Sequence, residues 1–159
     1  MTIGLQMMYM HDMASYQDVI ESYIVEKCAC HKVRMAARAV TRAYDDALRP
    51  VGLRATQLAV LVAIAIEGAM SITAMAKFMI MDRSTLTRNL RPLEEEGLVA
   101  VGLEGWRRSR TLEVTEKGRS RLAEALPLWK QAQQTLRRKL GEQNWVQIHS
   151  DLDQLIRAA

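Results

Sequence analysis

The sequence is poor in the residues that mark several classes of protein. Its 159 residues include two cysteines, three prolines and one phenylalanine, and aromatic residues make up only 5% of the chain. Two cysteines are too few for a fold built on disulfide bonds. The longest apolar run, LAVLVAIAI at 58–66, is shorter than the roughly 18 residues that a membrane-spanning helix needs. We therefore expect no membrane partner.

Targeting and catalytic motifs are also missing. The start, MTIGLQMMYMHDM, has no basic stretch before an apolar one, so we predict no signal peptide and a cytoplasmic protein. There is no glycine-rich phosphate loop, no nucleophile motif and no cluster of histidine and acidic residues. The three histidines, His11, His31 and His149, fall in separate predicted elements. We predict that the protein is not an enzyme and holds no metal or cofactor.

What the sequence does have suits one globular domain over residues 1–159. It is 49% hydrophobic and 25% charged, with a formal net charge of +4 and an isoelectric point near 9.3. This length permits a sizeable core. The modest positive charge is compatible with a nucleic-acid partner, but its placement matters more than its sum.

The first half of the chain reads as a series of helices. After a flexible tail over about 1–17, a helix with a narrow apolar seam is expected over 18–50, because apolar residues recur at three- and four-residue steps. A buried helix follows over 55–66. Ser71 and Asp82 are suited to cap two further helices, since their side chains can accept hydrogen bonds from the free N–H groups of the first turn.

The second half begins with a change of period. Residues 98–114 alternate apolar and polar positions on either side of EGWRRS, which predicts a β-hairpin with a basic tip. Thr115 then opens a helix to about Leu140, which Pro127 is expected to bend or split. A last amphipathic helix reaches the end of the chain. The fold class is therefore mainly α with a small β-hairpin: a winged helix-turn-helix over 53–115, flanked by long helices at 18–50 and 116–159.

The segment MDRSTLTRNLRPLEEEGLV, residues 81–99, has the pattern of a DNA-recognition helix. At 100° per residue its leucines share one stripe and its hydroxyls and arginines share the opposite face. Such a helix needs an apolar back and a front that reaches bases and phosphates. Arg88 is the best candidate for a bidentate guanine contact, and Pro92 is expected to bend the helix after it. The predicted DNA-contacting residues are Ser84, Thr85, Thr87, Arg88 and Arg91.

A solvated helix face is the simpler explanation of this pattern, and the hairpin tip argues against it. The tip carries Arg107, Arg108 and Arg110 with only Glu104 against them. A solubilising loop explains any one of these arginines. A wing over DNA phosphates or in the minor groove explains the tip and the helix together.

The order of these motifs resembles that of the MarR (multiple antibiotic resistance regulator) transcription factors. The resemblance rests on LRPVGLRATQLAVL, on SITAMAKFMIMDRSTLTRNLRPLEEEGLV and on RRSRTLEVTEKGR, and it covers roughly residues 30–155. It implies a homodimer whose first and last helices form the interface, and a pair of recognition helices that read a palindromic operator in double-stranded DNA. Where the family's wing usually has an acidic residue before its paired basic ones, this sequence has Trp106.

The resemblance also implies a small aromatic acid as ligand, since many family members lose DNA affinity when one binds. His31, Arg34, Arg38 and Trp129 are candidates for the pocket, because a carboxylate favours an arginine partner. Residue by residue, solvent-exposed charges and core aromatics are the commoner reading.

The motif CACH at 28–31 invites a metal or redox reading. On one helix, residues two apart point about 200° apart, which argues against a shared metal and against a bond between Cys28 and Cys30. Oxidation of one thiol, or a bond to a partner chain, stays open. Lys27, His31 and Lys32 could lower a thiol pKa, but small apolar packing is favoured for both cysteines.

Together these features predict a dimeric DNA-binding regulator, a repressor relieved by a small aromatic or phenolic ligand. Two alternatives remain: a thiol-based redox regulator acting through Cys28 and Cys30, and a winged-helix protein-interaction module without DNA binding. An interaction module has no need of arginines on both the helix and the hairpin tip, which favours the DNA-binding reading.

Overall fold

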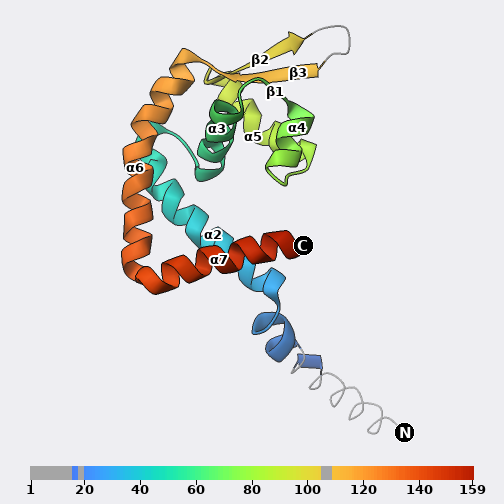
Figure 1. The fold of residues 1–159 in the computed structure, drawn as a ribbon, viewed down its shortest axis with the longest axis vertical. Helices are drawn as coiled ribbons and strands as arrows, with labels where there is room; N and C mark the ends of the chain where they lie inside the picture. Colours follow the sequence, from blue (N-terminus) through green and yellow to red (C-terminus); the bar gives the residue numbers. More distant parts are fainter. Residues whose placement is uncertain (1–15, 18–19, 105–108) are drawn as a thin grey trace, which may run out of the picture. The chain divides into compact units, whose positions relative to one another are not determined.

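The computed structural model describes residues 16–17, 20–104 and 109–159 of the chain. Residues 1–15 of the tail predicted over about 1–17 lie outside the described residues, as do Trp106, Arg107 and Arg108 of the hairpin tip. The chain divides into two compact units, 1–42 and 43–159. Its elements (Figure 1) are η1 Ile20–Val25, α2 Ala29–Leu48, η2 Arg49–Val51, α3 Ala55–Glu67, β1 Met70–Ser71, α4 Ile72–Phe78, α5 Arg83–Glu95, β2 Val99–Glu104, β3 Ser109–Val114, α6 Glu116–Leu140 and α7 Glu142–Ala158.

The first unit corrects one prediction, because the helix expected over 18–50 is interrupted. A short π-helix, η1, ends at Val25, and the α-helix α2 begins only at Ala29. The apolar seam has its gap at the same place. Glu26 and Lys27 occupy the positions three and four residues after Tyr23, where an amphipathic helix would place apolar side chains. Apolar side chains at these two positions would stabilise a helical turn by packing, and Glu26 and Lys27 do not provide them.

The second unit contains the winged-helix lobe. Helices α3, α4 and α5 lie on one side of the antiparallel sheet, as Figure 1 shows. The predicted hairpin is present as β2 and β3, with Val99 opposite Val114 and Val101 opposite Leu112. The sequence reading missed β1, whose Met70 and Ser71 pair with Leu112 and Thr111. Two residues are too few to show a period, so the order β1-β3-β2 was not visible in the sequence.

The core of this lobe is continuous from the end of α2 to the middle of α6. Its α3 helix is buried on several sides, as its nearly unbroken apolar sequence predicts. Fully buried leucines from α5 and the valines of the hairpin close the core from the other side. The largest buried side chains are Leu48, Val60, Leu61, Ile64, Met75, Leu86, Leu90, Leu93, Leu98 and Leu112.

Helix α6 starts against the end of α5. The Thr115 hydroxyl caps α6 by accepting from the Gly118 N–H at 3.0 Å, and it also donates to the Gly97 carbonyl at 2.7 Å. A Cβ on Gly118 would lie 2.1 Å from the Leu98 carbonyl oxygen, so this close approach requires glycine. From there α6 runs through Pro127 to Leu140 as one helix. Of the two effects expected of Pro127, a split is therefore excluded, and a bend stays a prediction.

Among the described residues, no single helix is long and apolar enough to cross a membrane. Taken together, Ala29–Val51 and Ala55–Glu67 pass such a test by length and composition, but they are bent by 76° at the break between them. The second of these segments is the core helix of the lobe, and its burial explains its apolar sequence.

Candidate nucleic-acid interface

Helix α5 has the two faces that the sequence predicted. Leu86, Leu90 and Leu93 on its back are at most 1% exposed. At about 1.5–3 kcal/mol for each fully buried side chain, these leucines fix the helix to the lobe. Ser84, Thr87, Arg88 and Arg91 on its front are exposed. The lobe therefore leaves this polar front exposed.

The amino end of α5 is organised by Asp82. Its carboxylate accepts from the Thr85 N–H at 2.8 Å and the Thr85 hydroxyl at 2.6 Å, and also from the Ser84 hydroxyl at 2.5 Å. The hydrogen bond from Ser84, followed by those from Thr85, holds the pKa of Asp82 well below its usual range. Asp82 thus stays ionised as the cap of α5, as the sequence predicted.

These bonds change what the hydroxyls of the predicted site can offer. The Ser84 and Thr85 hydroxyls already donate to Asp82, and the Thr87 hydroxyl donates to the Arg83 carbonyl at 2.8 Å. A phosphate oxygen needs a donor. The three hydroxyls must therefore exchange partners before they can donate to DNA, whereas their lone pairs remain free to accept from base amino groups.

Arg88 is the arginine on this face that is free to bind. Within the described residues, its guanidinium makes no hydrogen bond or ion pair. Arg91 instead bonds Glu95 one turn later, with Nε 2.8 Å from Oε1, and this hydrogen bond raises the Arg91 pKa. Both side chains of that pair are exposed, so a partner can separate them at small cost.

The acidic end of α5 is bound to α6. The Arg121 guanidinium lies 3.5 Å from the Glu96 carboxylate and donates to the Val51 carbonyl at 2.8 Å. Lys117 Nζ donates to the Glu96 carbonyl at 2.7 Å. Glu95 and Glu96 thus have basic partners, Arg91 on the same helix and Arg121 on α6. Pro92 lies inside α5, and the bend expected there stays a prediction.

Most of the predicted wing lies outside the described residues. Arg107 and Arg108 belong to 105–108, and of Arg110 only the backbone is described, opposite Leu103 in the hairpin. Their contacts with DNA stay a prediction. The hairpin itself lies beside α5, whose carboxyl end leads into β2 (Figure 1).

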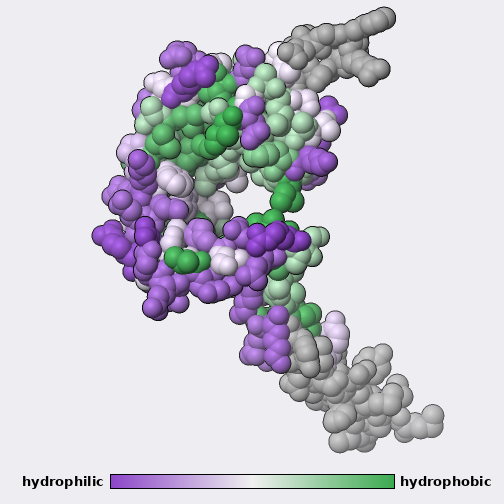
Figure 2. All heavy atoms as spheres, viewed as in Figure 1, coloured by the Kyte–Doolittle hydropathy of each residue, from purple (hydrophilic) through white to green (hydrophobic). Residues whose placement is uncertain are grey.

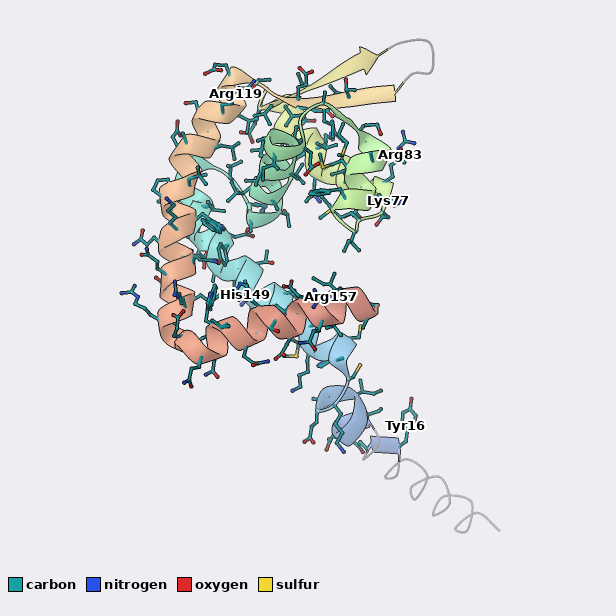
Figure 3. All side chains as sticks on the ribbon, in the orientation of Figure 1. Tyr16, Lys77, Arg83, Arg119, His149 and Arg157 are labelled. Carbon is teal, nitrogen blue, oxygen red and sulfur yellow. The ribbon has the colours of Figure 1, made fainter. Side chains whose placement is uncertain are left out.

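Two basic residues near this face were not among the predicted site residues. Arg83 is the first residue of α5 and Lys77 lies in the last turn of α4, and both are exposed. Figure 3 shows both at the corner where α4 and α5 meet, directed away from the lobe. Neither side chain has a partner within the part of the chain that the structure describes. The sequence signals differed: Arg83 directly follows the predicted cap Asp82, whereas Lys77 lies within the helix that Ser71 was predicted to cap.

Of the predicted ligand-pocket residues, Trp129 lines a cavity. The cavity measures about 290 Å³ and lies between the end of α2, α3 and α6. Burial raises the pKa of the Tyr44 phenol, whose hydroxyl donates to the Gln133 amide oxygen. Among the described residues, no charged side chain lines the cavity. Its lining residues are Tyr44, Ala55, Leu58, Ala59, Val62, Leu126 and Trp129.

The other candidates for ligand and redox chemistry lie in the first unit. His31, Arg34 and Arg38 are on α2 within 1–42 and do not line this cavity. Cys28 precedes α2 and Cys30 lies in its first turn, so the two cysteines do not share one regular helix. The geometric argument against a bond between them therefore fails. Both thiols are free; Cys28 is half-buried and Cys30 is exposed.

Comparison with known proteins identifies the fold and the family. The family model for MarR matches residues 53–101, which span α3 to the start of β2. The M. tuberculosis transcriptional regulator MosR, in a crystal structure with DNA, is 37% identical, with a TM-score of 0.75 over 83% of this chain and 96% of that one. The chain belongs to the MarR family.

Two further solved structures agree with this. The transcriptional repressor CouR, bound to a 23-mer DNA duplex, is 25% identical over 83% of this chain and 94% of its own, with a TM-score of 0.75. Bordetella bronchiseptica BpsR, at 24% identity over 82% and 95%, has the same fold with a TM-score of 0.73. No curated protein sequence matches the chain. This MarR-family protein is thus a winged-helix, DNA-binding transcriptional regulator, and its relatives are regulators rather than enzymes.

Proposed function

We propose that this protein is a homodimeric repressor that reads a palindromic operator through α5. Arg88 on the exposed front of α5 carries the proposal. It has no partner among the described residues, and a free guanidinium can bind guanine O6 and N7 together. MosR, its 37% identical relative, was crystallised in complex with DNA. We further propose that the repressor acts in the cytoplasm, where it has to reach its operator.

The proposed second copy covers α7 and its neighbours. Helix α7 buries none of its side chains, although its sequence is amphipathic. Its exposed large hydrophobic residues are Val146, Ile148, Leu152, Leu155 and Ile156. A twofold dimer would cover this face with the same face of its partner and would place two α5 helices against two half-sites of an operator.

The DNA-binding part is tested on an operator selected by the wild-type protein from a random-sequence duplex pool. Affinity for the selected duplex should fall steeply with salt, since phosphate contacts release counterions. Arg88→Ala should lose about 1–3 kcal/mol on that duplex. Arg138→Ala is the matched control, because it removes the same charge from α6, where Arg138 bonds Thr135 and no other described residue. Equal losses in the two variants, or no salt dependence, would reject the recognition role of Arg88.

The proposed inducer is a small aromatic or phenolic molecule held in the cavity at Trp129. The lining offers ring faces and methyl groups, with the Tyr44 hydroxyl and the Trp129 indole N–H as its side-chain polar groups. An aromatic acid would need a cation from outside this lining, and His31, Arg34 and Arg38 stay the candidates. In BpsR, DNA binding is regulated by 6-hydroxynicotinic acid.

A thermal-shift screen of phenols and aromatic carboxylic acids tests this site. A ligand at a hundred times its Kd should stabilise the protein by about 2.7 kcal/mol. The same ligand should release the wild-type protein from its duplex and fail to stabilise Trp129→Ala. Stabilisation that persists in Trp129→Ala would place the ligand elsewhere.

A redox-responsive regulator is the second candidate, favoured by the break before α2 that leaves Cys28 outside the helix and Cys30 exposed. Hydrogen peroxide would take two electrons from one thiolate, giving a sulfenic acid and hydroxide. Peroxide should then lower DNA affinity in the wild type and leave Cys28→Ser/Cys30→Ser unaffected. Unchanged wild-type affinity, or a full response in the double variant, would reject this candidate.

A further inference from the structure

The turn between α4 and α5 has an unusual residue at its centre. The Ile80 N–H donates to the Lys77 carbonyl at 3.2 Å, and the Met81 N–H donates to the Ala76 carbonyl at 2.8 Å. This pair of bonds is the Schellman motif that ends many helices. It requires a left-handed residue at the position of Ile80, which has a φ of 52°.

The end of α5 has the same motif with the usual residue. There the Gly97 N–H donates to Glu94 and the Leu98 N–H to Leu93, at 2.9 and 2.8 Å, and Gly97 has a φ of 69°. Across the residues that the structure describes, Ile80 is the only residue other than glycine with positive φ. The left-handed conformation costs about 1–2 kcal/mol for a residue with a Cβ. The penalty is greatest for β-branched residues such as isoleucine.

Packing within the chain does not offset this strain. Ile80 is 78% exposed, the largest exposed fraction among the large hydrophobic residues of the described chain, and Phe78 in the last turn of α4 is 53% exposed. Glycine at position 80 would relieve the strain and lose almost no buried surface. Strained backbone of this kind concentrates at functional sites.

The surroundings of the two side chains point to DNA as their partner. Lys77 and Arg83 lie on either side of the turn, both without a partner among the described residues, and Figure 3 shows them at the same corner of the lobe. Figure 2 shows hydrophobic side chains at the surface of this part of the lobe. The carboxylate of Asp82, two residues after Ile80, already accepts hydrogen bonds from the Ser84 and Thr85 hydroxyls. Phe78 and Ile80 thus form an apolar tip that lies between Lys77 and Arg83 and precedes α5. In a DNA groove, such a tip can contact sugars and base methyl groups while the two cations contact phosphates.

We propose that Phe78 and Ile80 form an apolar DNA contact at the amino end of α5, for which the chain retains a strained isoleucine in a glycine position. This rests on the proposed operator-reading function. Ile80 adds apolar contact while Lys77 and Arg83 supply the charge.

The test compares Ile80→Gly with the wild type on the duplex that the wild type selects from a random-sequence pool. Ile80→Gly should melt at a higher temperature, because the strain is removed. It should also bind the duplex about tenfold more weakly. Its dependence on salt should match that of the wild type, because an apolar side chain releases no counterions. Phe78→Ala should lose affinity in the same way.

Ile66→Ala is the matched control, since Ile66 is 73% exposed at the end of α3, and it should bind as the wild type does. Unchanged DNA affinity in Ile80→Gly would overturn the proposal. A protein would then be the alternative partner for Phe78 and Ile80. A loss of affinity accompanied by a lower melting temperature, or by a changed salt dependence, would overturn it too. If the wild type selects no sequence at all, the operator-reading function fails first, and this contact fails with it.

Discussion

Helices α5 and α7 are both amphipathic, yet only α5 buries its apolar side within the chain. Three leucines of α5 are buried in the lobe, whereas α7 has no buried residue among its 17. The spacing of apolar residues therefore specifies which side of a helix is buried in a contact. It does not specify whether the contact is with the same chain or with another one. For α7 we propose a second copy of the protein. This comparison makes the two helices respond differently to the same kind of substitution.

The largest effect on the lobe's stability is expected from Leu90→Ala. Leu90 is 1% exposed at the centre of the back of α5, so its truncation leaves a cavity as well as losing buried surface. The free energy of unfolding should fall by about 2–5 kcal/mol, as measured by urea denaturation. A loss below about 1 kcal/mol would show that α5 is not held by its apolar back.

The next largest loss in the free energy of unfolding is expected from Gly118→Ala. Its methyl group would meet the Leu98 carbonyl oxygen and the Val114 side chain at the junction of α6 with the lobe. Relieving that overlap should reduce the free energy of unfolding by about 1–3 kcal/mol. Gly141→Ala differs in having no atom near the added Cβ, although its φ of 78° strains any side chain. A smaller loss for Gly118→Ala than for Gly141→Ala would contradict the close approach.

Substitution on α7 should act through assembly instead. Ile156 is 59% exposed in the single chain, so Ile156→Glu should not destabilise the monomer. The melting temperature of the variant should equal the value that the wild type approaches when it is diluted. The wild type should melt higher as its concentration rises, because dimerisation stabilises the folded state by mass action. Sedimentation should show a dimer for the wild type and a monomer for the variant. A dimeric Ile156→Glu would remove α7 from the interface.

The smallest effect concerns the cap of α5. Hydrogen bonds lower the pKa of Asp82 in the folded protein, so its stabilising contribution is full above the usual aspartate value of about 3.9. The contribution disappears as the pH falls through the lower, folded pKa. The difference in melting temperature between wild type and Asp82→Asn should therefore narrow only in acid below that usual value. A difference that does not change with pH would show that the charge of Asp82 is irrelevant to the cap.

Most of the lobe could be predicted because local chemistry determines it. Asp82, Ser71 and Thr115 cap their helices as their side chains suggest, and the alternating valines of the hairpin form the expected pair of strands. The break before α2 and the strand β1 were missed. The first depends on packing that the charged residues around Glu26 do not provide, and the second on a pairing with residues far along the chain.

The sequence predicted which residues lie on each face of α5, but not which hydrogen bonds and ion pairs their side chains form. The periodicity of α5 correctly placed Arg88 in front and Leu90 behind. It could not show that the Ser84 and Thr85 hydroxyls donate hydrogen bonds to Asp82, nor that Arg91 forms an ion pair with Glu95. These hydrogen bonds between neighbouring side chains depend on side-chain geometry. They leave Arg83 and Arg88 as the cations of the helix that have no partner among residues 16–17, 20–104 and 109–159.

The central claim is that Arg88 reads a guanine in the operator. Methylation interference at guanine N7 on the selected duplex tests it most directly, because a methyl group at N7 removes one of the two acceptors that a bidentate arginine uses. We predict that methylation of one guanine in each half-site blocks the wild type and makes no difference to the residual binding of Arg88→Ala. The same interference pattern for both proteins, or none in the wild type, would contradict the claim.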